Sequence, residues 1–175
     1  RVDRGGHGDN EWRQLLMETR RWARIDRPGF PAVFEVRELG NGALVALAPT
    51  SAETLRRRLE RAVSRQQLLR WAEDVLDQLA EAHAAGVLHR HISLDSVLVD
   101  AQDHALLSGF ALTQRHPDPP DSRAPELRRG APPSPTSDLF ALAVALSKAA
   151  MVLPSGDSVV SDPLALVFRR ATSED

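Results

Sequence analysis

The stretch from His83 to Ser96 holds the side chains of this chain best suited to acid–base or metal chemistry. His83, His89 and His91 form an H-x₅-H-x-H pattern, and Asp95 lies in the loop segment that follows them. Imidazole and carboxylate groups act as general bases near neutral pH and also bind metals. A metal site is therefore one interpretation, although no carboxylate stands at helical spacing to complete it. Structural hydrogen bonding by the histidines is the other.

The elements around this stretch are predicted from hydrophobic periodicity. Ser64 precedes a helix that ends near Ala85, with an apolar stripe along one side and Gly86 placed to terminate it. Two short apolar strands, 96–99 and 104–108, follow on the other side of the stretch. The stretch is therefore predicted to be a loop held between a long helix and a strand pair.

The remaining elements point to an α+β fold class. Residues 9–25 have helical periodicity, and the apolar runs 31–38 and 43–48 flank Gly40-Asn41-Gly42 as a hairpin would. After Pro49 the pattern is mainly helical, whereas 114–136 is rich in proline and excludes a regular element over most of its length. The predicted helices of this second part are 52–62, with Ser51 as its cap, 137–151, opened by Ser137 or Asp138, and 162–171.

Composition limits the possible functions. Apolar residues make up 42% of the 175 residues and the net charge is −2, which is typical of a globular domain and gives no basis for nucleic-acid binding. There is no cysteine, so disulfides and thiolate chemistry are excluded. No apolar run reaches the roughly 18–20 residues of a membrane helix, so we expect no direct membrane insertion and a cytoplasmic location, with a tether elsewhere still open.

An ordered set of motifs resembles the protein kinase superfamily, in particular the bacterial serine/threonine kinases. Residues 18–36 resemble the end of the family's αC helix and its next strand, and 42–59 resemble the following strand, hinge and helix. Residues 76–99 resemble the helix and catalytic loop, in which "HRH" replaces the usual "HRD". The matching motifs further along are "SGF" in 104–112, "SRAPE" in 122–130 and "TSDLF" in 136–146.

The resemblance implies a bilobal kinase-like fold. Residues 1–48 would form a partial amino-terminal lobe with the αC helix and a hairpin, and 49–175 a mainly helical carboxy-terminal lobe. The glycine-rich loop would precede Arg1.

The departures from the family pattern fall on the chemistry. Kinases use a loop aspartate as base, an asparagine and the DFG aspartate on magnesium, and a lysine on the phosphates. The corresponding positions here are His91, Ser93 (after the base), Ser96 and Ser108, and the sole lysine, Lys148, lies in a later predicted helix. A positioned base supplies ~10²–10⁴ in rate, and without metal ligands it has little to act upon. The resemblance therefore implies a pseudokinase with no catalytic residue, metal or cofactor.

Positions that frame the site are retained. Asp138 matches the family aspartate that hydrogen-bonds the backbone of the catalytic loop, and His89 and Arg90 match the loop itself. Glu18 matches the αC glutamate; its lysine partner is missing, so we expect a solvated residue, with Arg1 or Arg4 as alternative partners. The motif that would close the activation segment is Ala124, Pro125 and Glu126.

Two classes of function follow from the resemblance. The first is an inactive interaction or regulatory module with protein partners. The second is a divergent serine/threonine kinase or nucleotide-dependent transferase that uses His91 or Asp95 and Mg·ATP, with the nucleotide at the hinge Ala46, Leu47 and Ala48. Asp95 is otherwise expected to bond the loop backbone. The arginine run Arg56, Arg57 and Arg58, with Arg61 and Arg65, would form a solvated face or a contact for an acidic partner.

Overall fold

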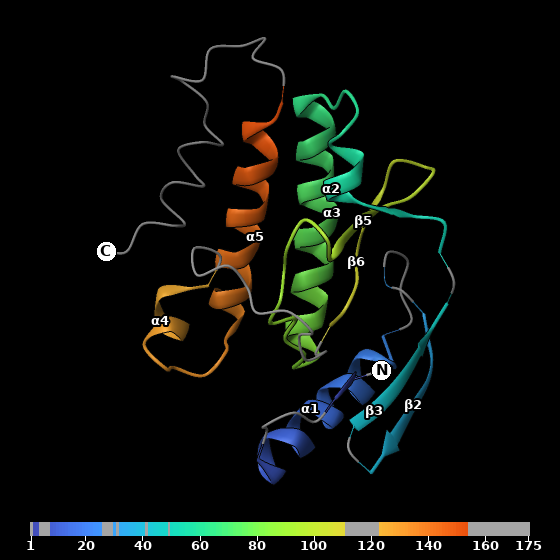
Figure 1. The fold of residues 1–175 in the computed structure, drawn as a ribbon, viewed down its shortest axis with the longest axis vertical. Coiled ribbons are helices and arrows are strands. Elements are labelled where there is room, and N and C mark those ends of the chain that lie inside the picture. The colour runs from blue at the N-terminus through green and yellow to red at the C-terminus, as the bar shows by residue number, and fades with distance from the viewer. Residues whose placement is uncertain are drawn as a thin grey trace.

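The computed structural model describes residues 2–3, 8–25, 30, 32–40, 42–48, 50–110 and 123–153 (Figure 1). Over these residues the predicted α+β class is confirmed, with helices and two antiparallel sheets of three short strands each. The predicted helix 162–171 and the proline-rich segment up to residue 122 lie outside the described residues. None of the described helices combines the length and the apolar character needed to span a lipid bilayer.

Helix α1 (Asp9–Trp22) packs against the first sheet, whose strand order is β1-β3-β2. The strands are β1 (Val2–Asp3), β2 (Val33–Leu39) and β3 (Gly42–Leu47), and the β2–β3 pair is the predicted hairpin, with Leu39 opposite Gly42. Trp12, Leu15 and Leu16 recur at helical spacing, and this face packs with Ala43 of the sheet. The opposite face of the helix, which includes Arg13, Met17 and Arg20, is exposed to solvent.

The second part of the chain is built around helix α3 (Arg65–Ala84), which stands beside helix α5 (Pro135–Met151) in Figure 1. The second sheet, with strand order β4-β5-β6, packs on α3; its strands are β4 (Glu53–Thr54), β5 (Val97–Val99) and β6 (Ala105–Leu107). Most of the apolar stripe predicted for α3 is buried in the larger core, but Leu76, which was predicted as part of it, is 43% exposed. Core residues from α3 and α5 include Leu68, Trp71, Val75, Leu79, Leu142, Ala145 and Leu146.

Side chains of α3 complete the hydrogen bonding of β6. The buried amide of Gln78 donates to the Ala105 carbonyl (2.8 Å) and accepts from the Leu107 N–H (2.7 Å), while Asp74 accepts from the Ala105 N–H (2.8 Å). Backbone groups buried without partners are costly, so these contacts let a helix cover a strand edge. They also fix the strand that leads directly to Ser108.

The ends of two helices differ from the predictions. The segment predicted as helix 52–62 is helical only at α2 (Leu55–Arg58), because Glu53 and Thr54 pair with β5 and Thr54, not Ser51, caps the helix. Helix α5 begins earlier than predicted. Ser134 and Ser137 form a reciprocal capping box, and Pro135 occupies the first turn, where its missing N–H costs nothing. The Ser64 cap of α3 is confirmed, and Gly86, at φ 70°, follows the helix as predicted.

Candidate functional site

Asp138 lies at the centre of the predicted site and is almost completely buried, with 1% of its surface exposed. One carboxylate oxygen accepts from the His89 N–H (2.9 Å), and the other accepts from the Arg90 N–H (2.7 Å). Nε2 of His83 lies 2.9 Å from the first of these oxygens. Buried carboxylate oxygens need hydrogen-bond donors, and the two loop N–H groups supply them. Helix α5 thus holds the loop between α3 and β5 through one side chain.

Glu18 is not the solvated residue that the sequence predicted. Its side chain is buried, and both of its carboxylate oxygens lie close to Nη2 of Arg90, at 2.6 and 2.8 Å. Arg90 adopts a left-handed backbone conformation with φ 72°, which is uncommon for a residue other than glycine. The prediction was wrong because Arg90 of the loop supplies a buried partner for Glu18. The alternative partners Arg1 and Arg4 lie outside the described residues.

Ser93, Ser96 and Ser108 are engaged with the backbone of the loop. The Ser96 hydroxyl accepts from the Ser93 N–H (2.9 Å) and lies 3.1 Å from the Ser93 carbonyl, to which it donates. The Ser108 hydroxyl and the Ser108 N–H both donate to the Ser96 carbonyl, at 3.0 and 2.9 Å. The two positions therefore lie side by side. Each hydroxyl directs its proton at a backbone carbonyl, and neither side chain carries a negative charge.

Asp95 was expected to bond the loop backbone, but its side chain binds Arg56 of helix α2 instead. Nε and Nη2 of Arg56 each lie 2.8 Å from a different oxygen of this carboxylate, which makes the pair bidentate. The hydrogen bond from Arg56 holds the pKa of the Asp95 carboxyl below its ordinary value, and the charges of Arg56 and His91 act in the same direction. The same contact raises the pKa of Arg56.

The arginine run of α2 is exposed over most of its length, yet it is also paired within the chain. Arg57 and Arg61 contact Glu53, and the Arg58 guanidinium lies 5.4 Å from the ring centroid of Trp71. These contacts place the run among internal ion pairs.

An aromatic cluster beneath the loop was also missed by sequence analysis. Phe110 is fully buried, and its ring centroid lies 4.8 Å from that of His89, 5.8 Å from that of Trp22 and 5.5 Å from that of Phe30. Nε2 of His89 lies 2.8 Å from the Ser108 carbonyl. His89 is thus part of the packing that joins helix α1 to the loop. The helical position of Trp22 was the one available signal, and it identified a core residue without its partners.

The three histidines do not converge on one point. His83 faces Asp138, His89 faces Ser108 and Phe110, and within the described ranges no three histidine or acidic side chains are grouped closely enough to hold a metal ion. A cavity of about 450 Å³ lies between α3 and the β5–β6 hairpin. Its lining, which includes Phe30, Asp77 and Glu81, contains none of the predicted site residues.

The other predicted positions lie further from the loop in the chain. Ala124 is buried and caps helix α4 (Pro125–Arg128), in which Glu126 is half-buried. At the predicted hinge, Ala46 and Leu47 belong to β3, and the Ala48 N–H donates to the Ala32 carbonyl (2.8 Å). All three hinge side chains are half-buried.

Comparison with known proteins gives a consistent set of relatives. No protein-family model matches the chain. It is 35% identical over 140 residues to the serine/threonine-protein kinase PkaB of Streptomyces coelicolor, a match that covers 66% of this chain and 34% of PkaB. It is 26% identical over 113 residues to the probable serine/threonine-protein kinase pknA2 of Bifidobacterium longum, covering 63% and 15% of the two chains. The chain therefore spans about a third or less of these relatives.

Proposed function

Because the chain is a distant homologue of the serine/threonine protein kinases, we propose that it is a catalytically inactive, pseudokinase-type domain. Its function would be to bind or regulate other proteins. The observation that carries the proposal is the pair of serines, Ser96 and Ser108, at the positions that the kinase resemblance assigns to the magnesium ligands. Both hydroxyls are hydrogen-bonded to backbone carbonyls within the chain.

The chemistry of magnesium supports this proposal. Mg²⁺ binds in proteins through one or two carboxylates together with phosphate oxygens and water, and it gives up its water reluctantly. A neutral hydroxyl that already donates to a carbonyl is a weak replacement for a carboxylate. Kinase catalysis consists almost entirely of positioning and charge stabilisation by these metal ions, so their loss removes its main source of rate enhancement.

The remaining carboxylate and imidazole of the loop do not restore the missing groups. Asp95 is the acidic residue next to Ser96, the position of the lost asparagine, and it is held bidentately by Arg56. His91 occupies the position that the kinase resemblance assigns to the catalytic base. An imidazole there could accept a proton, but it brings no negative charge to a cation. The loop is nevertheless kept in shape by Asp138. A loop that keeps its shape without these reagents supports the proposal of a binding module.

A thermal-shift titration with ATP, with and without Mg²⁺ or Mn²⁺, tests the proposal. We expect no metal-dependent rise in melting temperature, whereas a ligand at a hundred times its Kd would stabilise the fold by about 2.7 kcal/mol. The kinase domain of PkaB serves as the positive control. Transfer of labelled phosphate from ATP to a protein substrate, lost in the Asp95→Ala or His91→Ala variant, would instead establish a divergent kinase.

A further inference from the structure

We infer that the solvent face of helix α1 is a docking surface for an acidic segment of a protein partner, an inference that rests on the proposed function as an interaction module. The surface consists of Arg13, Met17, Arg20 and Arg24, which we call the basic ridge. These residues are spaced i, i+4, i+7 and i+11. The first three lie along one line on the helix, and Arg24 lies in the turn that follows it. All four are exposed.

Among the described residues, the charges of the basic ridge have few partners. In the part that the structure describes, no ion pair or side-chain hydrogen bond involves Arg13 or Arg24, and Arg20 reaches Glu38 only at 3.9 Å. Glu18 lies on the same helix but is turned into the core and bound to Arg90. By contrast, the arginines of α2 are paired with Glu53 and Asp95. Over the described part of the chain, the basic ridge is thus a line of positive charge whose one ion pair is the long contact of Arg20 with Glu38.

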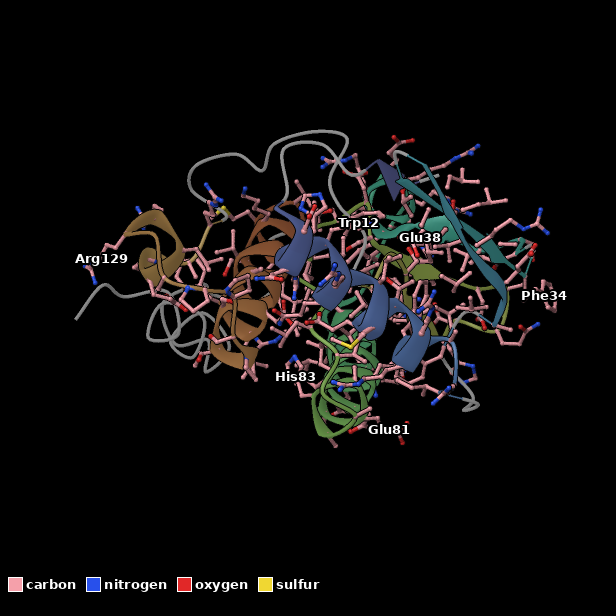
Figure 2. The ribbon with its side chains drawn as sticks, turned by 90° about the horizontal axis from the view of Figure 1, so that it is seen from below. Trp12, Phe34, Glu38, Glu81, His83 and Arg129 are labelled. Carbon is pink, nitrogen blue, oxygen red and sulfur yellow. The ribbon has the colours of Figure 1, made fainter. Side chains whose placement is uncertain are left out.

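The position of α1 makes the ridge accessible. The helix lies beside the lower end of the first sheet in Figure 1 and crosses the front of the molecule in Figure 2. Arg13 and Arg24 are separated by about 16 Å, at ~1.5 Å per residue along a helix. An extended segment of about five residues, at ~3.3 Å each, would cover this length. A short acidic stretch is therefore sufficient to contact all three arginines.

The surroundings favour a protein over the other polyanions. Single-stranded nucleic acid is bound through aromatic side chains on which bases stack, and both tryptophans of α1, Trp12 and Trp22, are buried. An anionic membrane requires an apolar face to insert, and Met17 is the one apolar member of the basic ridge. An isolated methionine at the centre of a charged line instead offers an adaptable apolar contact to a polypeptide side chain. Charge complementarity then requires carboxylates on that polypeptide.

The first measurement is fluorescence anisotropy with a labelled decapeptide of glutamate. It is made at low salt, because 0.1 M salt screens interactions between exposed charges that are more than about 10 Å apart. We expect the natural chain to bind it and the Arg13→Glu/Arg24→Glu variant to bind at least about 10-fold more weakly. The control is Arg57→Glu/Arg129→Glu, which changes the net charge by the same amount at two exposed arginines elsewhere (Arg129 in Figure 2). This control should bind like the natural chain.

The second measurement does not depend on any variant. The chain has two methionines, Met17 in the basic ridge, 52% exposed, and Met151 at the end of α5, 82% exposed. Their ¹³C-labelled methyl groups give two NMR signals. Addition of the glutamate peptide should shift the Met17 signal and leave that of Met151 unchanged.

Three results would overturn the inference. The first is that the Arg13→Glu/Arg24→Glu variant binds the glutamate peptide as tightly as the natural chain does. The second is that the folded natural chain does not bind the peptide. The third is that the natural chain, but not this variant, binds a decathymidylate or phosphatidylserine vesicles more tightly than the peptide. None of these bears on nucleotide binding, so failure of the ridge and failure of the proposed inactivity are separate results.

Discussion

Arg90 and Glu18 form a buried ion pair between residues 72 positions apart in the sequence, with Nη2 of Arg90 2.6 and 2.8 Å from the two carboxylate oxygens. The side chains are only 19% and 5% exposed. The pair joins helix α1 to the loop that Asp138 holds from the other side. The geometry of the loop is therefore set from two directions, by α1 and by α5.

Removing one member of this pair should destabilise the fold strongly. In Glu18→Leu, Arg90 keeps a buried positive charge without its counterion, which typically costs about 3–5 kcal/mol. In Glu18→Leu/Arg90→Met the charge is removed as well, so much of the loss should be recovered. Urea denaturation of the two variants and of Arg90→Met measures the coupling energy. A double variant as unstable as the sum of the single variants would show that the two residues act independently.

The exposed pair of Arg56 and Asp95 should contribute little, and its contribution should depend on pH. Because the pKa of the folded Asp95 carboxyl is lowered, the pair stabilises the fold above the ordinary carboxyl pKa, and this stabilisation is lost as pH falls through the lowered value. At neutral pH, Asp95→Asn should cost at most about 1 kcal/mol, since both side chains are largely exposed. The cost should shrink in acid, below the ordinary carboxyl pKa of about 4.

An NMR titration of the Asp95 carboxyl checks the cause directly. In Arg56→Ala the hydrogen bond and most of the nearby positive charge are absent, so the pKa of Asp95 should rise toward its ordinary value. An unchanged pKa in this variant would assign the shift to another group. Arg57→Ala, which removes an adjacent arginine without touching Asp95, is the matched control.

The two ion pairs also show where sequence reasoning succeeds and where it stops. Helices α1, α3 and α5 and the β2–β3 hairpin were predicted because apolar spacing, caps and turn residues are local signals. Glu18 with Arg90 and Arg56 with Asp95 are separated by 72 and 39 residues, and no local pattern connects them. The family resemblance identified the loop and Asp138. It also suggested that Glu18, without its lysine partner, would be exposed to solvent.

The short helix α2 illustrates a different limit. Residues 52–62 have the composition of a helix, yet Glu53 and Thr54 pair with Val99 and Leu98 of β5. A strand pairing between distant segments outweighs a local helix preference of a few tenths of a kcal/mol per residue. Predicting that helix α2 begins at Leu55 would have required knowing where β5 lies.

Gln78 should be among the most sensitive polar residues of the core. Its amide satisfies the Ala105 carbonyl and the Leu107 N–H at once, and it is buried. Gln78→Leu leaves both backbone groups without partners, at about 1–3 kcal/mol each, partly offset by the apolar side chain. We expect a loss of about 3 kcal/mol in the free energy of unfolding. Gln66→Leu, on the exposed side of the same helix, should change it by less than about 0.5 kcal/mol.

Restoring ligands at Ser96 and Ser108 tests whether their loss accounts for the proposed absence of metal chemistry. The Ser108 hydroxyl lies 3.0 Å from the Ser96 carbonyl, so an aspartate there would face an oxygen and should destabilise the free chain. A divalent cation offsets this repulsion, and the asparagine of Ser96→Asn adds a second oxygen ligand. Ser96→Asn/Ser108→Asp should therefore show an ATP-dependent rise in melting temperature of several degrees with Mg²⁺. Ser96→Ala/Ser108→Ala, which removes the hydroxyls without adding ligands, should show none. An equal rise in the natural chain would mean that it binds the cation through other groups. No rise in the Ser96→Asn/Ser108→Asp variant would mean that the two serines alone do not distinguish this chain from a kinase that binds Mg·ATP.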